Sequence, residues 1–410
     1  MSKLSKEYLF LLNTIKGILH NEETGEIESE SVNYERVLRI AVENGIANTI
    51  ADRIFGRKDA PENIKKEFYK QKMITMSRSI AADNNLQRVY ASLDAHKIRG
   101  LFLKGTILKK LYPKAYLRSM SDADVYAARE DMDEVYSLMI NMGYNTGAIG
   151  RGNHYEYMMG KGFKIEYHPE LVAISSWYGD RVFSKKHPEE KDIAIYMDIW
   201  NHTLPMETYE CARQLVPEYH YLYVIMHMMN HFLKSGTGIR SVMDVWVMNN
   251  HYADKWDREL IESLLEDYGL RTFEAYALAL ADRWFDLEKL PYLNKDVDAR
   301  VLEEYERYIL ESGTYGSTEH YVSRELGNKT GMENKVRYLA ELFFAPYGKM
   351  KRMYPVLEKA PVLLPIMWGG RAIDKFRLRG KKTRGKIKTV MKANKQKADW
   401  QSELMRKMVE

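Results

Sequence analysis

An Asp-x-Asp pair, Asp122-Ala123-Asp124, stands where an apolar run from Val125 to Ala128 begins. Alternate residues of a β-strand share a face, so the two carboxylates are expected on one side of a sheet, about 7 Å apart along the chain. Carboxylates this close repel each other unless a cation lies between them. Mg²⁺ suits that position because it takes hard oxygen ligands and shares them with phosphate groups. The pair therefore predicts a strand that carries a divalent metal ion.

A phosphate-binding turn is predicted upstream of this pair. An apolar run ends at Lys104-Gly105-Thr106, and a helix-like segment follows as far as Leu111. The first turn of a helix leaves backbone N–H groups free to bind a phosphate chain. Lys104 either neutralises phosphate or is a solvated charge at the end of a strand. Arg118, four residues before Asp122, either contacts the same phosphates or pairs with Asp122.

A third carboxylate is expected from a β-hairpin. Residues 154–159 and 163–168 form two strand-like runs joined by the glycine-bearing turn 160–162. On the second run Lys164, Glu166 and His168 alternate with apolar residues and so share a face. If this strand lies beside the Asp-x-Asp strand, Glu166 completes a set of three carboxylates able to hold two metal ions. Together these parts predict a metal-dependent nucleotidyl-transfer site.

The Gly-[Ser/Thr]…Asp-x-Asp…Glu pattern resembles the polymerase-β-type nucleotidyltransferase superfamily, and within it the bacterial uncharacterised nucleotidyltransferases. The matching motifs, from about residue 100 to about residue 375, are Leu103-Lys104-Gly105, Tyr112-Pro113, Arg118-Ser-Met-Ser-Asp122-x-Asp124, Ile165-Glu166-Tyr167-His168, His227-x-x-x-His231, Gly238-Ile239-Arg240, Asp244-Val245, Phe344-Ala345-Pro346 and Tyr354-Pro355. Thr106 stands where the superfamily often has Ser, and Pro169 follows His168 where an aromatic residue is commoner. Neither departure removes an expected metal ligand.

The resemblance implies an enzyme that transfers a nucleoside monophosphate from a nucleoside triphosphate to an acceptor and releases pyrophosphate. Asp122 and Asp124 would bridge two Mg²⁺ ions, while Glu166 would complete one metal site and help to deprotonate the acceptor. Four residues would hold the triphosphate: Lys104, Gly105, Thr106 and Arg118. ATP is the expected donor by abundance alone. The acceptor would be a small hydroxylated molecule or a protein side chain, and a nucleic-acid end is not expected because basic residues do not cluster around the motifs.

Helical patterns dominate outside this segment, so the expected fold class is α+β, mostly helical, with one small mixed sheet. Pro61 fits the first turn of a long helix that reaches about His96, in which Met73, Met76 and Ile80 form an apolar stripe expected in the core. Four regions are predicted: an N-terminal helical region (1–96), an αβ nucleotidyltransferase core (97–205), a helical domain lining the cleft (206–345) and a basic C-terminal region (346–410).

Polar residues of the second helical region are expected at the edge of the cleft. His227 and His231 lie at i and i+4, a spacing that can bind zinc, but no Glu lies between them and no third ligand is obvious. Arg240 and Asp244 are also four residues apart, and they form either a local ion pair or part of the cleft lining. The candidates for that lining are His168, His231, Arg240 and Asp244.

The composition favours a protein of the cytoplasm. A single cysteine, Cys211, excludes an internal disulfide and fits a reducing compartment. No apolar run approaches the roughly 20 residues needed to span a bilayer, so no transmembrane segment is expected. The first residues, Met-Ser-Lys-Leu-Ser-Lys-Glu, lack the apolar stretch of a signal peptide.

Basic residues are concentrated at the C-terminus. From Arg371 onward there are fourteen Lys and Arg against four Asp and Glu, a net charge of +10 in a chain of net charge +5. Such a tail is either a solvated, partly helical segment or a contact for a polyanion or an anionic membrane surface. It lacks the interleaved aromatic residues that stack bases. We expect it to be separable from the site. The rival functions are a nucleotide-binding protein without catalysis and an adaptor that acts through this tail.

Overall fold

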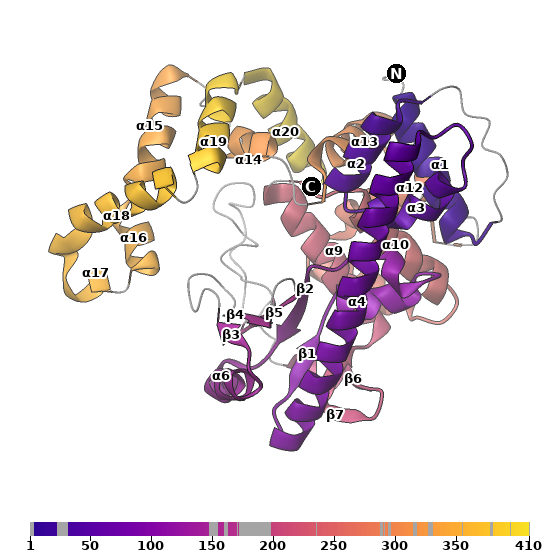
Figure 1. The fold of residues 1–410 in the computed structure, drawn as a ribbon, viewed down its shortest axis with the longest axis horizontal. Coiled ribbons are helices and arrows are strands. Elements are labelled where there is room, and N and C mark those ends of the chain that lie inside the picture. The colour runs from indigo at the N-terminus through magenta and orange to yellow at the C-terminus, as the bar shows by residue number, and fades with distance from the viewer. Residues whose placement is uncertain are drawn as a thin grey trace.

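In the computed structural model of the 410-residue chain, the described residues form one mixed sheet and a larger set of helices (Figure 1). The structure describes residues 4–22, 32–146, 155–159, 163–169, 171, 198–234, 236–287, 290, 292–293, 297–314, 318–326, 331–354, 356–377, 380–393 and 395–409. The predicted hairpin turn 160–162 and residues 172–197 of the predicted αβ core lie outside them.

Within the described residues the sheet has seven strands in the order β3-β4-β5-β2-β1-β7-β6. The strands are β1 (Gly100–Phe102), β2 (Asp122–Tyr126), β3 (Asn145–Thr146), β4 (Tyr155–Met159), β5 (Phe163–His168), β6 (Thr203–Met206) and β7 (Tyr209–Leu215). β5 runs parallel to β2 and β7 runs parallel to β1, whereas the other neighbours are antiparallel. The predicted α+β class with a mixed sheet is confirmed, and the sheet continues past residue 205 because the β6–β7 hairpin adds to β1.

Helices precede, interrupt and follow the sheet. The first group is α1 (Lys6–Leu19), α2 (Tyr34–Glu43), α3 (Ala47–Phe55), α4 (Glu62–His96), α5 (Gly105–Leu108) and α6 (Met132–Asn141). The second group is α9 (Pro217–Lys234), α10 (Ile239–Tyr252), α11 (Arg258–Asp267), α12 (Arg271–Phe285) and α13 (Ala299–Ser312). The third group is α14 (Thr318–Leu326), α15 (Met332–Phe343), α16 (Tyr347–Met353), α17 (Val356–Lys359), α18 (Leu364–Arg377), α19 (Gly380–Lys392) and α20 (Lys395–Lys407). Short 3-10 turns lie at Lys109–Leu111, Ala115–Leu117, Arg129–Asp131, Ile199–His202 and Pro361–Leu363.

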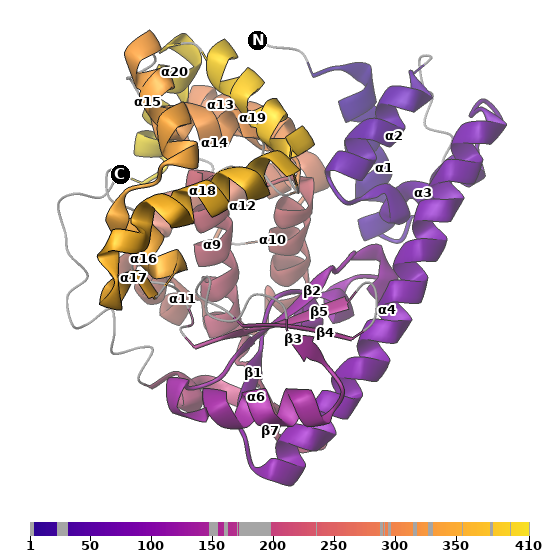
Figure 2. The ribbon, with the colours of Figure 1, turned by 60° about the vertical axis from the view of Figure 1, so that its left-hand side comes forward.

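The two faces of the sheet meet different helices. On one face Ala123, Val125 and Ile165 are buried in a core shared with α4 and α6. The opposite face carries the intervening residues of the same strands and is turned toward α9 and α10 (Figure 2). Strand alternation therefore directs the charged residues of β2 and β5 toward a helical layer, away from the hydrophobic core.

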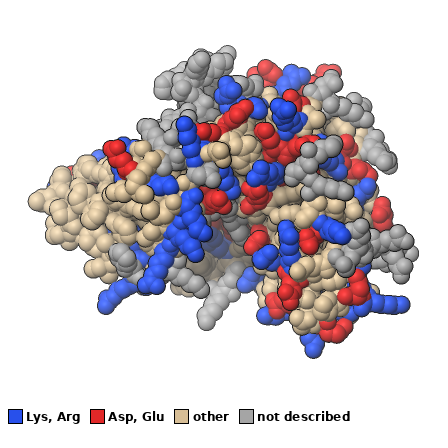
Figure 3. Space-filling model, turned by 90° about the horizontal axis from the view of Figure 1, so that it is seen from above, with Lys and Arg blue, Asp and Glu red and all other residues tan. Residues whose placement is uncertain are grey.

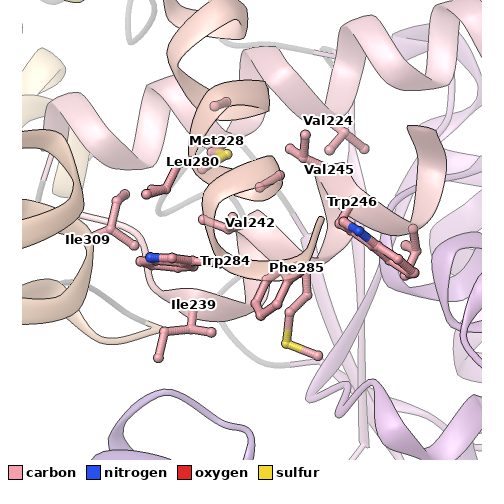
Figure 4. Packing of buried hydrophobic residues seen from close by; sticks show 14 of the residues in the cluster. Val224, Met228, Ile239, Val242, Val245, Trp246, Leu280, Trp284, Phe285 and Ile309 are labelled. Atoms are coloured by element: carbon pink, nitrogen blue, oxygen red, sulfur yellow. The ribbon is translucent and has the colours of Figure 1, made fainter. Parts of the chain in front are cut away.

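That helical layer is built on the largest hydrophobic core of the described residues. Residues of α1, α2 and α3 pack there with residues of α9 to α13. Trp246, Trp284 and Phe285 lie among aliphatic side chains in this core (Figure 4) and are 2%, 4% and 0% exposed. Aromatic side chains of this size contribute much of the stability of a core, so this core holds α9 and α10 in position.

Helix α4 joins this core to the sheet. Phe68, near its start, is buried in the helical core, whereas residues from Ala82 onward are buried against the sheet. Met73 and Ile80 lie between the two cores and are 46% and 60% exposed. The long helix predicted up to His96 is confirmed, but the prediction that its Met73 and Ile80 stripe is core is wrong, because this stretch only spans the distance between the two cores.

The basic C-terminal region is helical in its described residues, and its last helix belongs to the main core. Leu404, Met405 and Met408 are buried there among residues of the helical layer. A deletion from Arg371 would therefore remove buried core side chains, whereas separability of the tail from the site stays a prediction. None of the described helices combines the length and apolarity that crossing a membrane requires.

Candidate active site

The parallel pairing of β2 and β5 brings the predicted carboxylates together. Asp124 lies opposite Glu166 in the register, and Asp122 lies opposite Lys164. One ligand atom from each of Asp124, Glu166 and His168 lies within 4.8 Å of the others. Asp122 and Asp124 share a face of β2 because they are two residues apart on a strand. The Asp pair and the hairpin carboxylate thus occupy one surface of the sheet.

Lysine and histidine side chains contact these carboxylates. Lys104 Nζ lies 2.9 Å from Asp124 Oδ2, and His168 Nε2 lies 2.9 Å from Asp124 Oδ1. Lys164 forms an ion pair with Glu166 from the same strand. Lys104 has φ 46° and ψ −116°, a backbone conformation that is rare for a residue with a side chain and that is found mostly at functional sites.

The two aspartates differ in their electrostatic surroundings. Burial, followed by repulsion from Asp124 and Glu166, raises the pKa of Asp122 above its ordinary value. Burial acts in the same direction on Asp124, but Lys104 and His168 outweigh it and hold the pKa of Asp124 well below its ordinary value. Asp124 is therefore stabilised as an anion, while Asp122 is the group whose charge lacks sufficient compensation.

A cavity of about 460 Å³ lies between this face of the sheet and helices α9 and α10. Ten of the eleven predicted site residues line it: Lys104, Gly105, Arg118, Asp122, Asp124, Glu166, His168, His231, Arg240 and Asp244. The eleventh, Thr106, is 2% exposed, and its buried hydroxyl has no hydrogen-bond partner among the described residues. The expected phosphate contact of Thr106 stays a prediction, and α5, which begins at Gly105, is only four residues long.

The hydrogen bonds of the Arg118 guanidinium go to Asp244 on α10, which was not the partner considered from the sequence. Its Nε and Nη2 each donate to a different Asp244 oxygen at 2.7 Å, and Tyr112 Oη donates to Asp244 Oδ1 at 2.7 Å. Both charged side chains are 8% exposed. A Cβ on Gly105 would lie 2.5 Å from Arg118 Nη1, so the guanidinium packs directly against the Gly105 turn. Arg118 therefore ties the turn to the helical layer.

Arg240 anchors to the loop before β2. Its Nη1 donates to the Ser119 carbonyl oxygen and contacts Ser119 Oγ, both at 3.1 Å. The i, i+4 spacing suggested a local Arg240–Asp244 ion pair, but the partners seen in the structure are longer-range: Ser119 for Arg240 and Arg118 for Asp244. Both side chains line the cavity, as the alternative reading of the spacing predicts.

A row of aromatic rings on α9 lines the helical side of the cavity. Tyr223, His227 and His231 follow one another at intervals of four residues, and all three line the cavity. Lys104 Nζ lies 5.9 Å from the centre of the Tyr223 ring. Tyr223 was not among the residues predicted for the site, although its i−4 spacing from His227 is the signal that places it there.

The two histidines form a neutral pair. Their Nε2 atoms lie 3.0 Å apart. Burial, with a further contribution from Lys104, lowers the pKa of His227 well below its ordinary value and lowers the pKa of His231 to about 4. Among the described residues no third His, Cys, Asp or Glu forms a metal-binding group with them.

A family model for uncharacterised nucleotidyltransferases matches residues 30–286, more than half of the 410 residues. The match places the protein in the nucleotidyltransferase class, to which the carboxylate arrangement on the sheet also points. The chain belongs to the uncharacterised nucleotidyltransferase family. The match begins and ends earlier than the resemblance over about 100–375 indicated. Comparisons with curated proteins and with solved structures gave no match.

Proposed function

We propose that the protein transfers a nucleoside monophosphate from a nucleoside triphosphate to a hydroxyl or similar nucleophile of a small-molecule or protein acceptor, with release of pyrophosphate. The observation that carries this proposal is the β2–β5 register, which sets Glu166 opposite Asp124 on the face that also carries Asp122. Membership of the family supports the class of reaction. ATP is taken as the donor by abundance alone.

The donor atoms of this site fit magnesium. Asp122, Asp124 and Glu166 supply hard carboxylate oxygens on one surface, and the raised pKa of Asp122 reflects first burial and then repulsion that a cation would relieve. These three residues would hold two Mg²⁺ ions, which when bound would neutralise charge on the attacking and leaving oxygens.

Side chains on both walls of the cavity are suited to the triphosphate. Lys104 reaches in from the sheet side, while Lys234 and Arg240 line the cavity from the helical layer. Positive groups held in fixed positions stabilise charge that develops during phosphoryl transfer. Glu166 lies on the cavity wall beside Asp124 and would accept the proton of the attacking hydroxyl.

The size of the cavity supports a small bound molecule. Its volume of about 460 Å³ falls within the range of roughly 300 to 1,000 Å³ found for small-molecule and cofactor sites. A mononucleotide is therefore a suitable occupant, and the acceptor would approach from the open side of the cavity.

A nucleotide-binding protein without turnover is the second candidate. The Lys104–Asp124 ion pair favours it, because the ammonium group occupies one Asp124 oxygen and His168 the other. Both neighbours must give up contact before Asp124 can offer both oxygens to metal ions. This candidate predicts Mg²⁺-dependent nucleotide binding without a labelled product.

The deciding experiment incubates the full chain with each α-labelled nucleoside triphosphate, Mg²⁺ and a cell extract, and then identifies what becomes labelled. We expect label transfer that is abolished in Asp124→Asn and unchanged in Asp133→Asn. Asp133 is a matched control, because it is an exposed aspartate on α6, across the sheet from the cavity. Calorimetric binding of MgATP with no labelled acceptor would favour the second candidate, and full transfer by Asp124→Asn would contradict the proposed site.

A further inference from the structure

Exposed apolar side chains gather in the C-terminal helices. The most exposed large apolar residues among those described are Val362, Ile366 and Met332, at 82%, 65% and 62%. Single exposed apolar residues are ordinary on a protein surface, but several on one segment mark a contact surface, for a protein partner or for a membrane. This segment lies beyond residue 286, outside the part of the chain that the family model matches.

Helix α18 and the turn before it carry the clearest apolar stripe. Ile366 and Ile373 are seven residues apart on α18, two helical turns, and Val362 lies one turn before Ile366. Ile373 is 57% exposed. Gly369 and Gly370, between the two isoleucines, are exposed as well, so the stripe is flat there.

The opposite side of α18 is fixed to the protein. Met367 and Trp368 pack against a small core that contains Leu357, and Trp368 Nε1 donates to the Ala345 carbonyl oxygen at 2.9 Å. The helix is therefore held by its inner side while its outer side presents aliphatic groups. The apolar stripe is therefore exposed on a helix whose other side is packed against the protein.

Strong positive charge follows the stripe directly. Residues 361–370 contain no charged residue, whereas residues 371–392 contain ten Lys and Arg against one Asp, a net charge of +9. Arg377 at the end of α18 and Arg384 and Lys388 on α19 are exposed. In Figure 3 the surface at the left, over α16 to α18, is almost free of charged residues and adjoins Lys and Arg side chains.

We propose that the exposed side of the 361–392 segment docks the protein on an anionic membrane surface. A bilayer interface offers an apolar layer for aliphatic side chains beside acidic headgroups for Lys and Arg, which matches both features of the segment. The contact is peripheral, since none of the described helices could cross the bilayer.

Other polyanions and protein partners match the segment less well. A nucleic acid would use the charge but not Val362, Ile366 and Ile373, because bases stack on aromatic or guanidinium groups. The centre of a protein–protein interface is enriched in Tyr, Trp and Arg, whereas this stripe consists of Val and Ile.

The test measures co-sedimentation of the full chain with vesicles of phosphatidylcholine alone and with vesicles in which about a third of the lipid is phosphatidylserine. The full chain is used because Leu404 and Met405, beyond the segment, belong to the main core. We expect binding to the anionic vesicles at least about tenfold above binding to the neutral ones, and a steep fall as salt is raised.

Two sets of variants separate the apolar and charged contributions. Ile366→Glu with Ile373→Glu should lower binding to the anionic vesicles by about tenfold or more. Ile80→Glu is the matched control, since Ile80 is 60% exposed on α4, and it should leave binding unchanged. Circular dichroism of each variant confirms that the helices are intact.

For the charge, Arg377→Glu with Lys388→Glu is compared with Lys58→Glu and Lys66→Glu, which change the net charge equally at exposed positions near the N-terminus. Only the first pair should weaken vesicle binding. Equal binding to both kinds of vesicle would overturn the proposal, as would wild-type binding by the isoleucine variant. Binding to a DNA duplex that depends on Arg377 and Lys388, without vesicle binding, would assign the segment to nucleic acid and also overturn it.

Discussion

Replacing Asp244 with alanine tests how much the buried Arg118–Asp244 pair stabilises the wall of the cavity. The Asp244 carboxylate accepts three hydrogen bonds of 2.7 Å, two from Arg118 and one from Tyr112. Arg118 and Asp244 are each only 8% exposed, so each charge depends mainly on the other for its compensation. In Asp244→Ala the guanidinium stays buried without a counter-charge, and the Tyr112 hydroxyl loses its acceptor.

The magnitude follows from these two losses. Removing one partner of a buried ion pair costs about 3 to 5 kcal/mol, and a buried hydroxyl without a partner costs about 1 to 3 kcal/mol. Because Arg118 and Tyr112 share one carboxylate, the losses overlap, and we expect Asp244→Ala to lower the free energy of unfolding by about 4 kcal/mol. The double variant Arg118→Met with Asp244→Leu removes both charges at similar volume and should recover about 3 kcal/mol of that loss.

Urea unfolding followed by tryptophan fluorescence measures this, since Trp246 lies two residues from Asp244 on α10. Asp133→Ala, at an exposed position, is the control and should change the free energy of unfolding by less than about 0.5 kcal/mol. A loss below about 1 kcal/mol in Asp244→Ala would refute the reasoning, as would a double variant no more stable than the single one.

Three further predictions concern the site. Without metal at pH 7, Asp122→Asn should raise the free energy of unfolding by roughly 1 kcal/mol, because a carboxylate with a raised folded-state pKa destabilises the folded protein as pH rises through that pKa. Asp124→Asn should lower the free energy of unfolding by about 3 kcal/mol, because a carboxylate with a lowered folded-state pKa stabilises the folded protein above its unfolded-state pKa, near 4. Thermal unfolding in EDTA between pH 3 and about pH 7 checks both signs, and both differences should shrink toward acid. Glu166→Gln should lower turnover by about a thousandfold or more while calorimetry shows a smaller loss of MgATP affinity than in Asp122→Asn; equal losses of affinity would contradict this division of roles. Gly105→Ala should weaken MgATP binding about tenfold or more, since the new Cβ meets Arg118 Nη1 at 2.5 Å, and unchanged binding would show that the turn does not hold phosphate.

The opposite effects expected for the Asp122 and Asp124 substitutions on stability show what the sequence could not supply. The spacing of the two residues indicates mutual repulsion, and on that basis either substitution is expected to leave the metal-free protein unchanged or slightly stabilised. The structure restricts that gain to Asp122, since Lys104 and His168 contact Asp124. Lys104 comes from the end of β1, twenty residues away, so no local spacing rule includes it.

Features set by local periodicity were predictable. Alternation along β2 and β5 places Asp122, Asp124 and Glu166 on the polar face. The predicted site required these two strands to be neighbours, and they are paired in the structure. Gly45 lies just after α2 with φ 62°, which explains why the helix stops there. The exposed part of α4 was not predictable, because an apolar stripe looks the same whether it meets a core or crosses between two cores.

The cavity depends on contacts that join distant parts of the chain. The i, i+4 spacing of Arg240 and Asp244 favours a local pair, but burial beside Arg118 gives Asp244 a bidentate partner 126 residues earlier. That partner packs against Gly105, so the geometry of the Gly105 turn depends on α10. A change on α10 that displaces Arg118 should therefore alter the turn without touching it. The helical layer is in this sense part of the site, which explains why the αβ segment alone does not define it.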